Sequence, residues 1–216
     1  MNYLNREQRR DMILAAAKTL ALKEGLNALT VRAIATQAKV STGQVHHHFE
    51  SASHLKAQVF IELMDQLNEL EAQVLTDSWL QRISLLLGCE NIEQTQPYLR
   101  LWNEAEILIE QDIEIKKAYN LTMQRWHNVL VQLIQDGIQQ KQFKMLETTT
   151  AQDVAWRLIA FVCGLEGIYQ LGLQGLDQPS FQRHVEIMIK MELMLSLIHI
   201  SEPTRPVCSS RMPSSA

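Results

Sequence analysis

Hydrophobic residues recur every three or four positions along most of the chain, which is the period of an α-helix rather than of a β-strand. The spacing predicts a first helix that follows Asn5, buries Ile13 and Leu20, and ends at Gly25. Asn5 with Gln8 three residues later has the form of a capping box. Gly25 suits the left-handed backbone conformation that ends many helices. The chain therefore opens with one well-delimited helix.

Two short helices joined by a tight turn are predicted next. Thr30 can cap a helix that runs to about Ala38, Lys39 begins the turn, and Ser41 can cap a further helix that ends near Phe49. This arrangement is typical of a helix-turn-helix, which places its second helix in the major groove of DNA. The segment is the first sign of function in the chain.

The helical period continues through the remaining residues. Ser53 can cap a helix that starts at His54, and Pro97 suits the first turn of another. Further helices are predicted from Ile115 to Gln140, from Thr149 or Thr150 onward, and over about 180–194. Neither an alternating strand pattern nor an internal repeat is present. The sequence predicts an all-α fold.

The composition of the 216 residues, 46% hydrophobic and 20% charged, is that of a globular protein with one large or two smaller domains. No apolar run approaches the ~20 residues that cross a bilayer, and the first residues do not form a secretory signal. We therefore expect a cytoplasmic protein that makes no membrane contact. Cys89, Cys163 and Cys208 fit neither a zinc pattern nor a disulfide framework.

Charge is distributed unevenly between the two ends of the chain. The net charge is −4, yet residues 1–60 contain eight Lys or Arg and only four Asp or Glu, so the remainder carries −8. A small basic part on an acidic body fits a protein that contacts nucleic-acid phosphates at one end. If the helix-turn-helix were left aside, chance clustering of the basic residues would be the alternative explanation.

The helix-turn-helix resembles the head of the tetracycline-repressor (TetR/AcrR-like) family of transcriptional regulators over residues of about 8–62. The matching positions are Gly25, Thr30, Ile34, Ala35, Ala38, Val40, Ser41, Gly43, Val45 and Phe49. Within that family, the segment STGQVHHHF has a weaker resemblance to the choline-responsive repressors of the betaine pathway.

The chain departs from the family pattern at several positions. Lys39 replaces the usual glycine of the turn, and His46 and His48 stand where tyrosine is common. Ala52 replaces a phosphate-contacting lysine, for which His54 or Lys56 can substitute. The departures put the turn geometry and the contact of the fourth helix in question.

The resemblance and the chemistry of the side chains together give a set of candidate DNA contacts. Gln44 can form paired hydrogen bonds with adenine, and Val45 and Phe49 are expected in the core. The candidates are Thr30, Arg32, Ser41, Thr42, Gly43, Gln44, His46, His47, His48 and Lys56. Consecutive helical histidines point ~100° apart and cannot converge on one ion, so we expect no metal site.

The resemblance further implies that the acidic body binds a small effector and forms a homodimer. The candidate ligand-binding residues are Trp79, Trp102, Glu106, Tyr119, Met123, Trp126 and Phe161. Plain core packing is an equal alternative for each of them. The acidic run from Glu104 to Glu114 can favour a cationic ligand, although a solvated helix face is the preferred interpretation. The candidate dimer residues are Trp156, Ile159, Val162, Cys163, Gly167, Val185 and Met188.

The last residues do not follow the helical pattern. Segment 195–205, LSLIHISEPTR, also resembles an in-frame translation of a common transposase-type sequencing adapter. We expect residues 195–216 to be a non-native or disordered tail, and a native disordered tail remains the alternative.

The sequence thus predicts a DNA-binding head over residues 1–53, a helical ligand-binding and dimerisation body over 54–194, and the tail. The function expected is a TetR-family repressor that binds a palindromic double-stranded DNA operator as a homodimer and responds to an unknown small molecule. The alternatives are an activator or ligand-independent regulator and a helical enzyme or carrier. Against catalysis, the chain has no nucleophile–base pair, metal cluster or phosphate-binding loop at recognisable spacing. No cofactor is expected.

Overall fold

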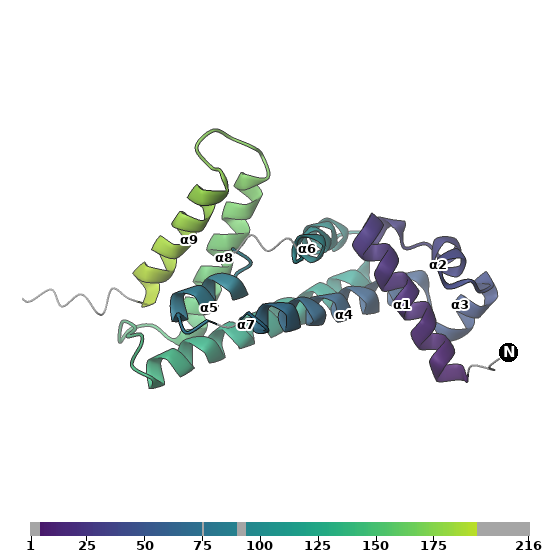
Figure 1. Ribbon diagram of the computed structural model, residues 1–216, viewed down its shortest axis with the longest axis horizontal. Coiled ribbons are helices and arrows are strands. Elements are labelled where there is room, and N and C mark those ends of the chain that lie inside the picture. Colours follow the sequence, from purple (N-terminus) through teal and green to yellow (C-terminus); the bar gives the residue numbers. More distant parts are fainter. Residues whose placement is uncertain (1–4, 75, 90–93, 194–216) are drawn as a thin grey trace, which may run out of the picture.

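The computed structural model describes residues 5–74, 76–89 and 94–193, and the candidate tail lies outside these ranges (Figure 1). Within them the chain forms nine α-helices and one 3-10 helix, with no strand, which confirms the all-α fold. The elements are α1 (Arg6–Glu24), η1 (Leu26–Ala28), α2 (Val31–Ala38), α3 (Thr42–His48), α4 (Ala52–Ala72), α5 (Trp79–Leu86), α6 (Gln96–Leu108), α7 (Ile113–Gln139), α8 (Ala151–Tyr169) and α9 (Gln178–Leu193).

The helices α4 and α7 lie side by side and connect the two ends of an elongated molecule (Figure 1). The head formed by α1, α2 and α3 lies at one end. At the other end α8 and α9 form a hairpin, and α6 lies between this hairpin and α1. None of the described helices is long and apolar enough to cross a membrane.

Local capping accounts for the start of the first helix. The amide of Gln8 donates to Asn5 Oδ1 at 2.8 Å, and the amide of Asn5 donates to Gln8 Oε1 at 3.0 Å, so the predicted capping box is confirmed. Gly25 ends α1 as predicted, with a φ of 92° in the positive range that favours glycine. Its ψ of 172° differs from that of the predicted left-handed helical cap, and the chain continues directly into η1.

The start of α4 also differs from the prediction. Ser51, and not Ser53, caps the helix, because Ser51 Oγ accepts the amide hydrogen of His54 at 3.1 Å. Ser53 instead lies near Asp112 at the start of α7, and its hydroxyl helps to lower the pKa of that carboxyl. The predicted domain boundary between residues 53 and 54 therefore falls inside α4.

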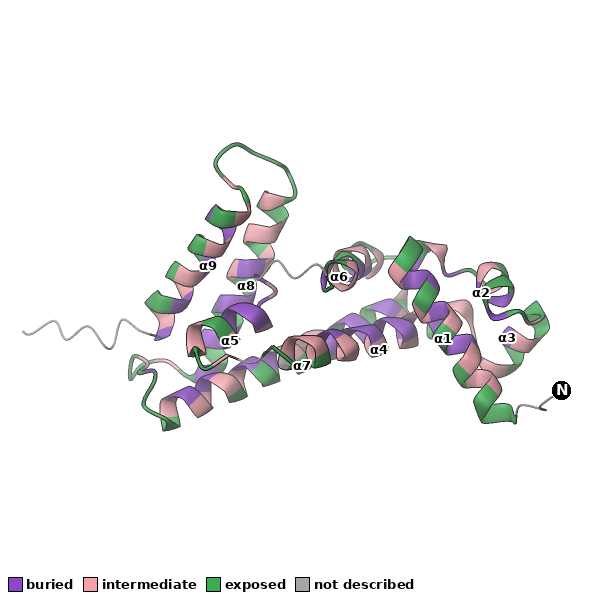
Figure 2. Ribbon diagram, viewed as in Figure 1, coloured by how far each residue is buried: buried purple, intermediate pink, exposed green. Residues whose placement is uncertain are grey.

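Buried hydrophobic residues form two clusters. The first extends from α1, α2 and α3 through α4 to α6 and α7, and the second joins α5, α7, α8 and α9. Met123 of α7 packs against both. Figure 2 shows the connection between α8 and α9 largely exposed. The first cluster thus joins head and body along α4.

Candidate DNA-binding head and body cavity

The helix-turn-helix has the geometry that its sequence predicts. Thr30 Oγ1 accepts the amide hydrogen of Ala33 at 3.2 Å, and Ser41 Oγ accepts that of Gln44 at 3.3 Å. Lys39 ends α2 in the left-handed conformation, with φ 55° and ψ 44°. The turn therefore has a backbone conformation that favours glycine, although a lysine stands there.

Buried side chains fix the short helix α3 against the rest of the head. Val45 and Phe49 are buried, as expected, and Phe49 also contacts the guanidinium of Arg10, 5.1 Å from the ring centroid. The opposite face of α3 is open to solvent. The candidate contacts on α2, α3 and their N-terminal caps that are exposed are Thr30, Arg32, Ser41, Thr42, Gly43, His46 and His47, while Gln44 is half-buried.

His48 differs from the other two histidines of α3. Its Nδ1 is buried and has no hydrogen-bond partner among the described residues. Burial of the ring, followed by the positive charges of His47 and of arginines on α1 such as Arg6, lowers the pKa of His48 from its ordinary value. The ring of His47 lies against it, with centroids 5.2 Å apart. His48 thus faces the protein more than the solvent.

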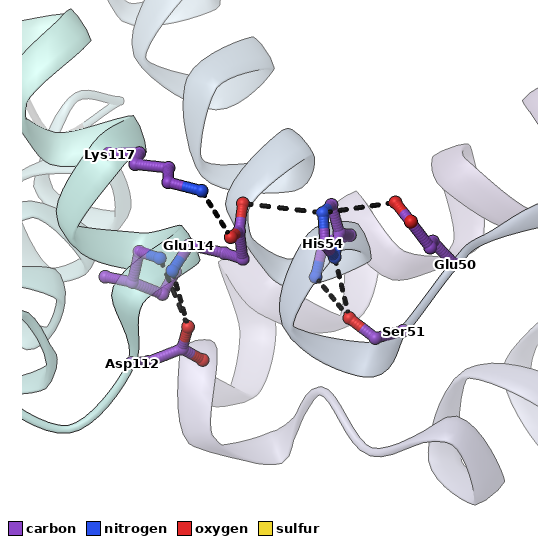
Figure 3. A network of polar contacts seen from close by, with 7 residues as sticks. Glu50, Ser51, His54, Asp112, Glu114 and Lys117 are labelled. Carbon is purple, nitrogen blue, oxygen red and sulfur yellow. Dashed lines mark hydrogen bonds and ion pairs between the residues drawn. The ribbon is translucent and has the colours of Figure 1, made fainter.

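A polar network fixes the start of α4 to the body (Figure 3). His54 Nε2 lies 3.2 Å from Glu50 Oε2 and 3.5 Å from Glu114 Oε2, and Glu114 in turn pairs with Lys117 at 2.8 Å. His54 thus lies between two carboxylates, although its side chain is 44% exposed. Lys56 is half-buried near Asp112. Both predicted substitutes for the missing lysine at Ala52 therefore have a carboxylate neighbour within the chain.

Some of the positive charge of the head serves internal contacts. Lys18 pairs with Glu62 of α4 at 3.0 Å, and Arg10 Nη2 donates to Gln58 Oε1 at 2.7 Å. Arg32 is exposed at the start of α2, where a phosphate contact requires it. The positive charge available to DNA is accordingly smaller than the residue count suggests.

A cavity of about 430 Å³ lies in the body between α4, α6, α7 and α8, closed by the end of α5 and by Phe181 of α9. Three of the predicted ligand-binding residues, Trp102, Glu106 and Trp126, line it. The structure places the other four elsewhere. Tyr119 packs behind Trp102, with ring centroids 4.7 Å apart.

The other three predicted ligand residues also lie off the cavity. Trp79 packs edge-on against Phe143 at the far end of the body, with centroids 5.7 Å apart. Met123 and Phe161 are half-buried and pack against the hydrophobic clusters. These side chains pack against other residues of the chain, as in the alternative interpretation of core packing.

Polar lining residues of the cavity were missed by the sequence reasoning. They are Asp65, Asn68, Glu71, Asn103, Arg125 and Glu166. Arg125 Nη1 donates to both carboxylate oxygens of Asp65 at 2.9 Å. A polar position within an otherwise apolar helix stripe is the one local signal for such residues, and it does not show which cavity they share.

The predicted dimer residues fall into three groups. Val162, Cys163 and Gly167 line the cavity. Ile159 and Val185 are buried within the single chain, while Met188 is half-buried. Trp156 is 47% exposed and stacks on His127, with centroids 4.2 Å apart. The exposed apolar residues on this hairpin also include Ile168, Ile187 and Met191.

The helix α6 contacts both the cavity and the head. Arg100 Nη2 donates to the carbonyl oxygen of Leu22 at 2.8 Å, near the C-terminal end of α1. Glu104 Oε2 accepts the amide hydrogen of Leu26 at 2.6 Å. A β-carbon at Gly25 would lie 2.6 Å from the same carboxylate. Trp102 and Asn103 of the same helix line the cavity.

These features define a helical regulator with a DNA-binding head on a cavity-bearing body. Residues 13–62 match the family model described as bacterial regulatory proteins, tetR family. The head thus carries the tetR-family domain, and the fold of the chain resembles that of TetR-family regulators.

Relatives agree with this assignment. The chain is 28% identical over 148 residues to the HTH-type transcriptional repressor KstR2 of Mycolicibacterium smegmatis, a match that covers 63% of this chain and 68% of that protein. The fold resembles that of a TetR-family regulator from a Rhodococcus species, with a TM-score of 0.67 at 22% identity over 86% of this chain and 98% of the other. A regulator from Saccharomonospora viridis, solved in complex with choline, has a TM-score of 0.62 at 20% identity over 87% and 98% of the two chains. The relatives are regulators and not enzymes.

Proposed function

We propose that this regulator is a repressor that binds a palindromic operator in the cytoplasm as a homodimer and releases it when a small molecule occupies the body cavity. In this proposal residues 1–53 are the DNA-binding head and residues 54–194 are the body. The repressor role has the support of one relative, which is a repressor.

One observation carries the proposal: α3 is buried on the side of Val45 and Phe49, while its first turn is open to solvent. The hydroxyls of Ser41 and Thr42 and the amide of Gln44 are available there for base edges and phosphates. Arg32 adds a positive charge at the start of α2. A recognition helix needs this combination of a fixed inner face and a polar outer one.

The helix α6 supplies a path from the cavity to the head. Its residues Trp102 and Asn103 line the cavity, and its residues Arg100 and Glu104 hold the end of α1. A ligand that shifts α6 therefore changes the position of α1 and with it the head. Such a ligand releases DNA if it binds the released arrangement more tightly than the DNA-bound one.

The hairpin of α8 and α9 offers the dimer interface. Trp156, Ile168, Ile187 and Met191 are each between 47% and 54% exposed in the single chain. Gly164 on α8 has no atom within 4 Å of an added β-carbon, so a second helix can approach closely there. Pairing of two copies at this hairpin would give the two-fold symmetry that a palindromic operator requires.

The experiment begins with selection of bound duplexes from a random pool by the full chain. Affinity for the selected and for a random duplex is then measured by fluorescence anisotropy over a range of salt concentrations. Gln44→Ala should weaken binding to the selected duplex by about 1–3 kcal/mol and leave binding to the random duplex unchanged. Arg32→Ala should weaken both and reduce the salt slope by about 1.

Lys23→Ala is the matched control, because Lys23 is exposed on the head but pairs with Glu24 at the end of α1. It should leave both affinities unchanged. Absence of any selected sequence, or equal effects of Gln44→Ala and Arg32→Ala on both duplexes, contradicts the proposed division of roles. Transcription from a promoter that carries the selected site then separates a repressor from an activator.

A further inference from the structure

The body cavity combines aromatic rings with an excess of negative charge. Trp102 and Trp126 line it, with ring centroids 5.6 Å apart and planes at 74°. The indole nitrogen of Trp126 donates to the carbonyl oxygen of Leu86 at 2.7 Å, which fixes the ring. Two held indoles offer π-faces, to which a cation is attracted.

The charged side chains of the cavity are four carboxylates and one guanidinium. Asp65 is neutralised by Arg125 through two contacts of 2.9 Å. Glu166 accepts a hydrogen bond from Gln170 at 2.6 Å, which adds no positive charge. Glu71 and Glu106 form no hydrogen bond or ion pair with another described residue. The cavity thus holds three carboxylates without a cationic partner in the described part of the chain.

We infer that the effector cavity takes an organic cation, such as a quaternary ammonium compound with an apolar group, and that Glu71, Glu106 and the two indoles of Trp102 and Trp126 recognise it. This inference rests on the proposed effector role of the cavity and specifies the chemical class of the ligand. A cation supplies the positive charge that the carboxylates lack, and its apolar group fills the aromatic part. An anion would be repelled by those of the three carboxyl groups that are ionised, and a neutral ligand would leave them without a cationic partner.

Glu71 gives the cavity a second property. It lies on α4 with its side chain half-buried among Leu67, Leu87 and other lining groups, and burial raises its pKa to about 8. Below that pH the carboxyl is mostly protonated and must release its proton to pair with a cation. Cation binding should therefore strengthen as the pH rises toward about 8 and become constant above it.

Other titratable groups face the cavity from the helices around it. They are Asp65 on α4, Glu106 on α6, Arg125 on α7, and Cys163 and Glu166 on α8. Burial raises the pKa of the Cys163 thiol to about 11, outside the range in question.

The test uses benzyltrimethylammonium and its neutral carbon isostere neopentylbenzene, titrated calorimetrically into the full chain without DNA. The two molecules share shape and differ in charge. The cation should bind at least about tenfold more tightly than the isostere, as expected for a charge-assisted contact. Glu71→Gln and Glu106→Gln should each lower the affinity for the cation about tenfold and leave the affinity for the isostere unchanged.

Glu69→Gln is the matched control, because Glu69 is exposed on the same helix as Glu71 and does not line the cavity. It should bind both compounds as the wild type does. Glu71→Gln should also abolish the rise of affinity between about pH 6 and about pH 8. If circular dichroism shows that Glu71→Gln does not fold, Glu106→Gln decides the question, since its carboxylate is exposed.

Equal binding of the cation and the isostere, or of the cation to the wild type and to both glutamine variants, overturns the inference. Neither outcome touches DNA binding, which the selection experiment measures by itself. If no duplex is selected, the proposed repressor function fails while cation binding remains measurable. The two failures are thus distinguishable.

Discussion

Lys39 adopts a backbone conformation that is unfavourable for a residue with a β-carbon. It has φ 55°, in the left-handed region where a β-carbon is disfavoured, and it is exposed. The tight turn between α2 and α3 nevertheless requires this conformation. The head of this protein therefore retains a local strain that a glycine would remove.

Lys39→Gly should increase the free energy of unfolding by about 1 kcal/mol, because glycine adopts positive φ without the steric cost of a β-carbon. Urea denaturation followed by circular dichroism measures the change. Lys39→Ala keeps the β-carbon and should give no such gain. A gain of equal size in both variants would assign the effect to the lost charge and not to the backbone.

His48 predicts a pH dependence of stability. Its pKa is lowered in the folded chain, chiefly by burial, so protonation favours the unfolded state. Its contribution is therefore lost as the pH falls below 6.5, the ordinary value for histidine. In thermal denaturation, His48→Gln should reduce the loss of melting temperature between pH 7 and pH 5.5. His46→Gln, a change at an exposed residue of the same helix, should leave that loss as it is.

At the scale of the elements, the capping residues decide what could be predicted. The starts of α1, α2 and α3 follow from Asn5, Thr30 and Ser41, because each cap bonds an amide three residues later. The start of α4 could not be predicted, since Ser51 and Ser53 are equally good caps in the sequence. In the structure Ser51 is the cap, and Ser53 lies inside the first turn near Asp112.

The cavity shows the same limit more strongly. Its two tryptophans could be chosen from the sequence because large aromatic side chains often line pockets. Glu71 and Asp65 could not, since their helix α4 contributes residues to the core and to the cavity on neighbouring faces. Only the packing of α4 against α6, α7 and α8 shows which polar residues share a space.

The contact between α6 and the head leads to a prediction about signal transmission. Glu104→Ala removes the acceptor for the Leu26 amide but leaves the cavity lining intact. The affinity for the ligand in the absence of DNA should be unchanged. The factor by which the ligand weakens DNA binding should fall, because the variant loses some or all of a coupling free energy of about 1–3 kcal/mol. Anisotropy titrations with and without ligand measure this factor.

Glu110→Ala serves as the control for that variant. Glu110 is exposed just beyond α6 and pairs weakly with Lys116, at 3.9 Å. It should leave the coupling as it is in the wild type. A Glu104→Ala protein with undiminished coupling would show that the signal does not pass through this contact.

At the scale of the whole molecule, the exposed apolar face of α8 and α9 is the main feature that a single chain leaves uncovered. Ile187→Glu combined with Met191→Glu places two charges on this face and should convert the proposed dimer to a monomer. Sedimentation velocity measures the change, and operator affinity should fall with it. Leu146→Glu, at an exposed apolar residue before α8, should remain dimeric.

The pair of indoles in the cavity has an optical consequence. Trp102 and Trp126 are close enough, at 5.6 Å, for their electronic transitions to couple, and the 74° between the planes makes that coupling chiral. Near-ultraviolet circular dichroism should therefore carry a signal specific to this pair, absent from Trp126→Phe. A molecule that enters the cavity and turns either ring should alter that signal, so occupancy of the cavity in the protein without DNA can be followed without a label.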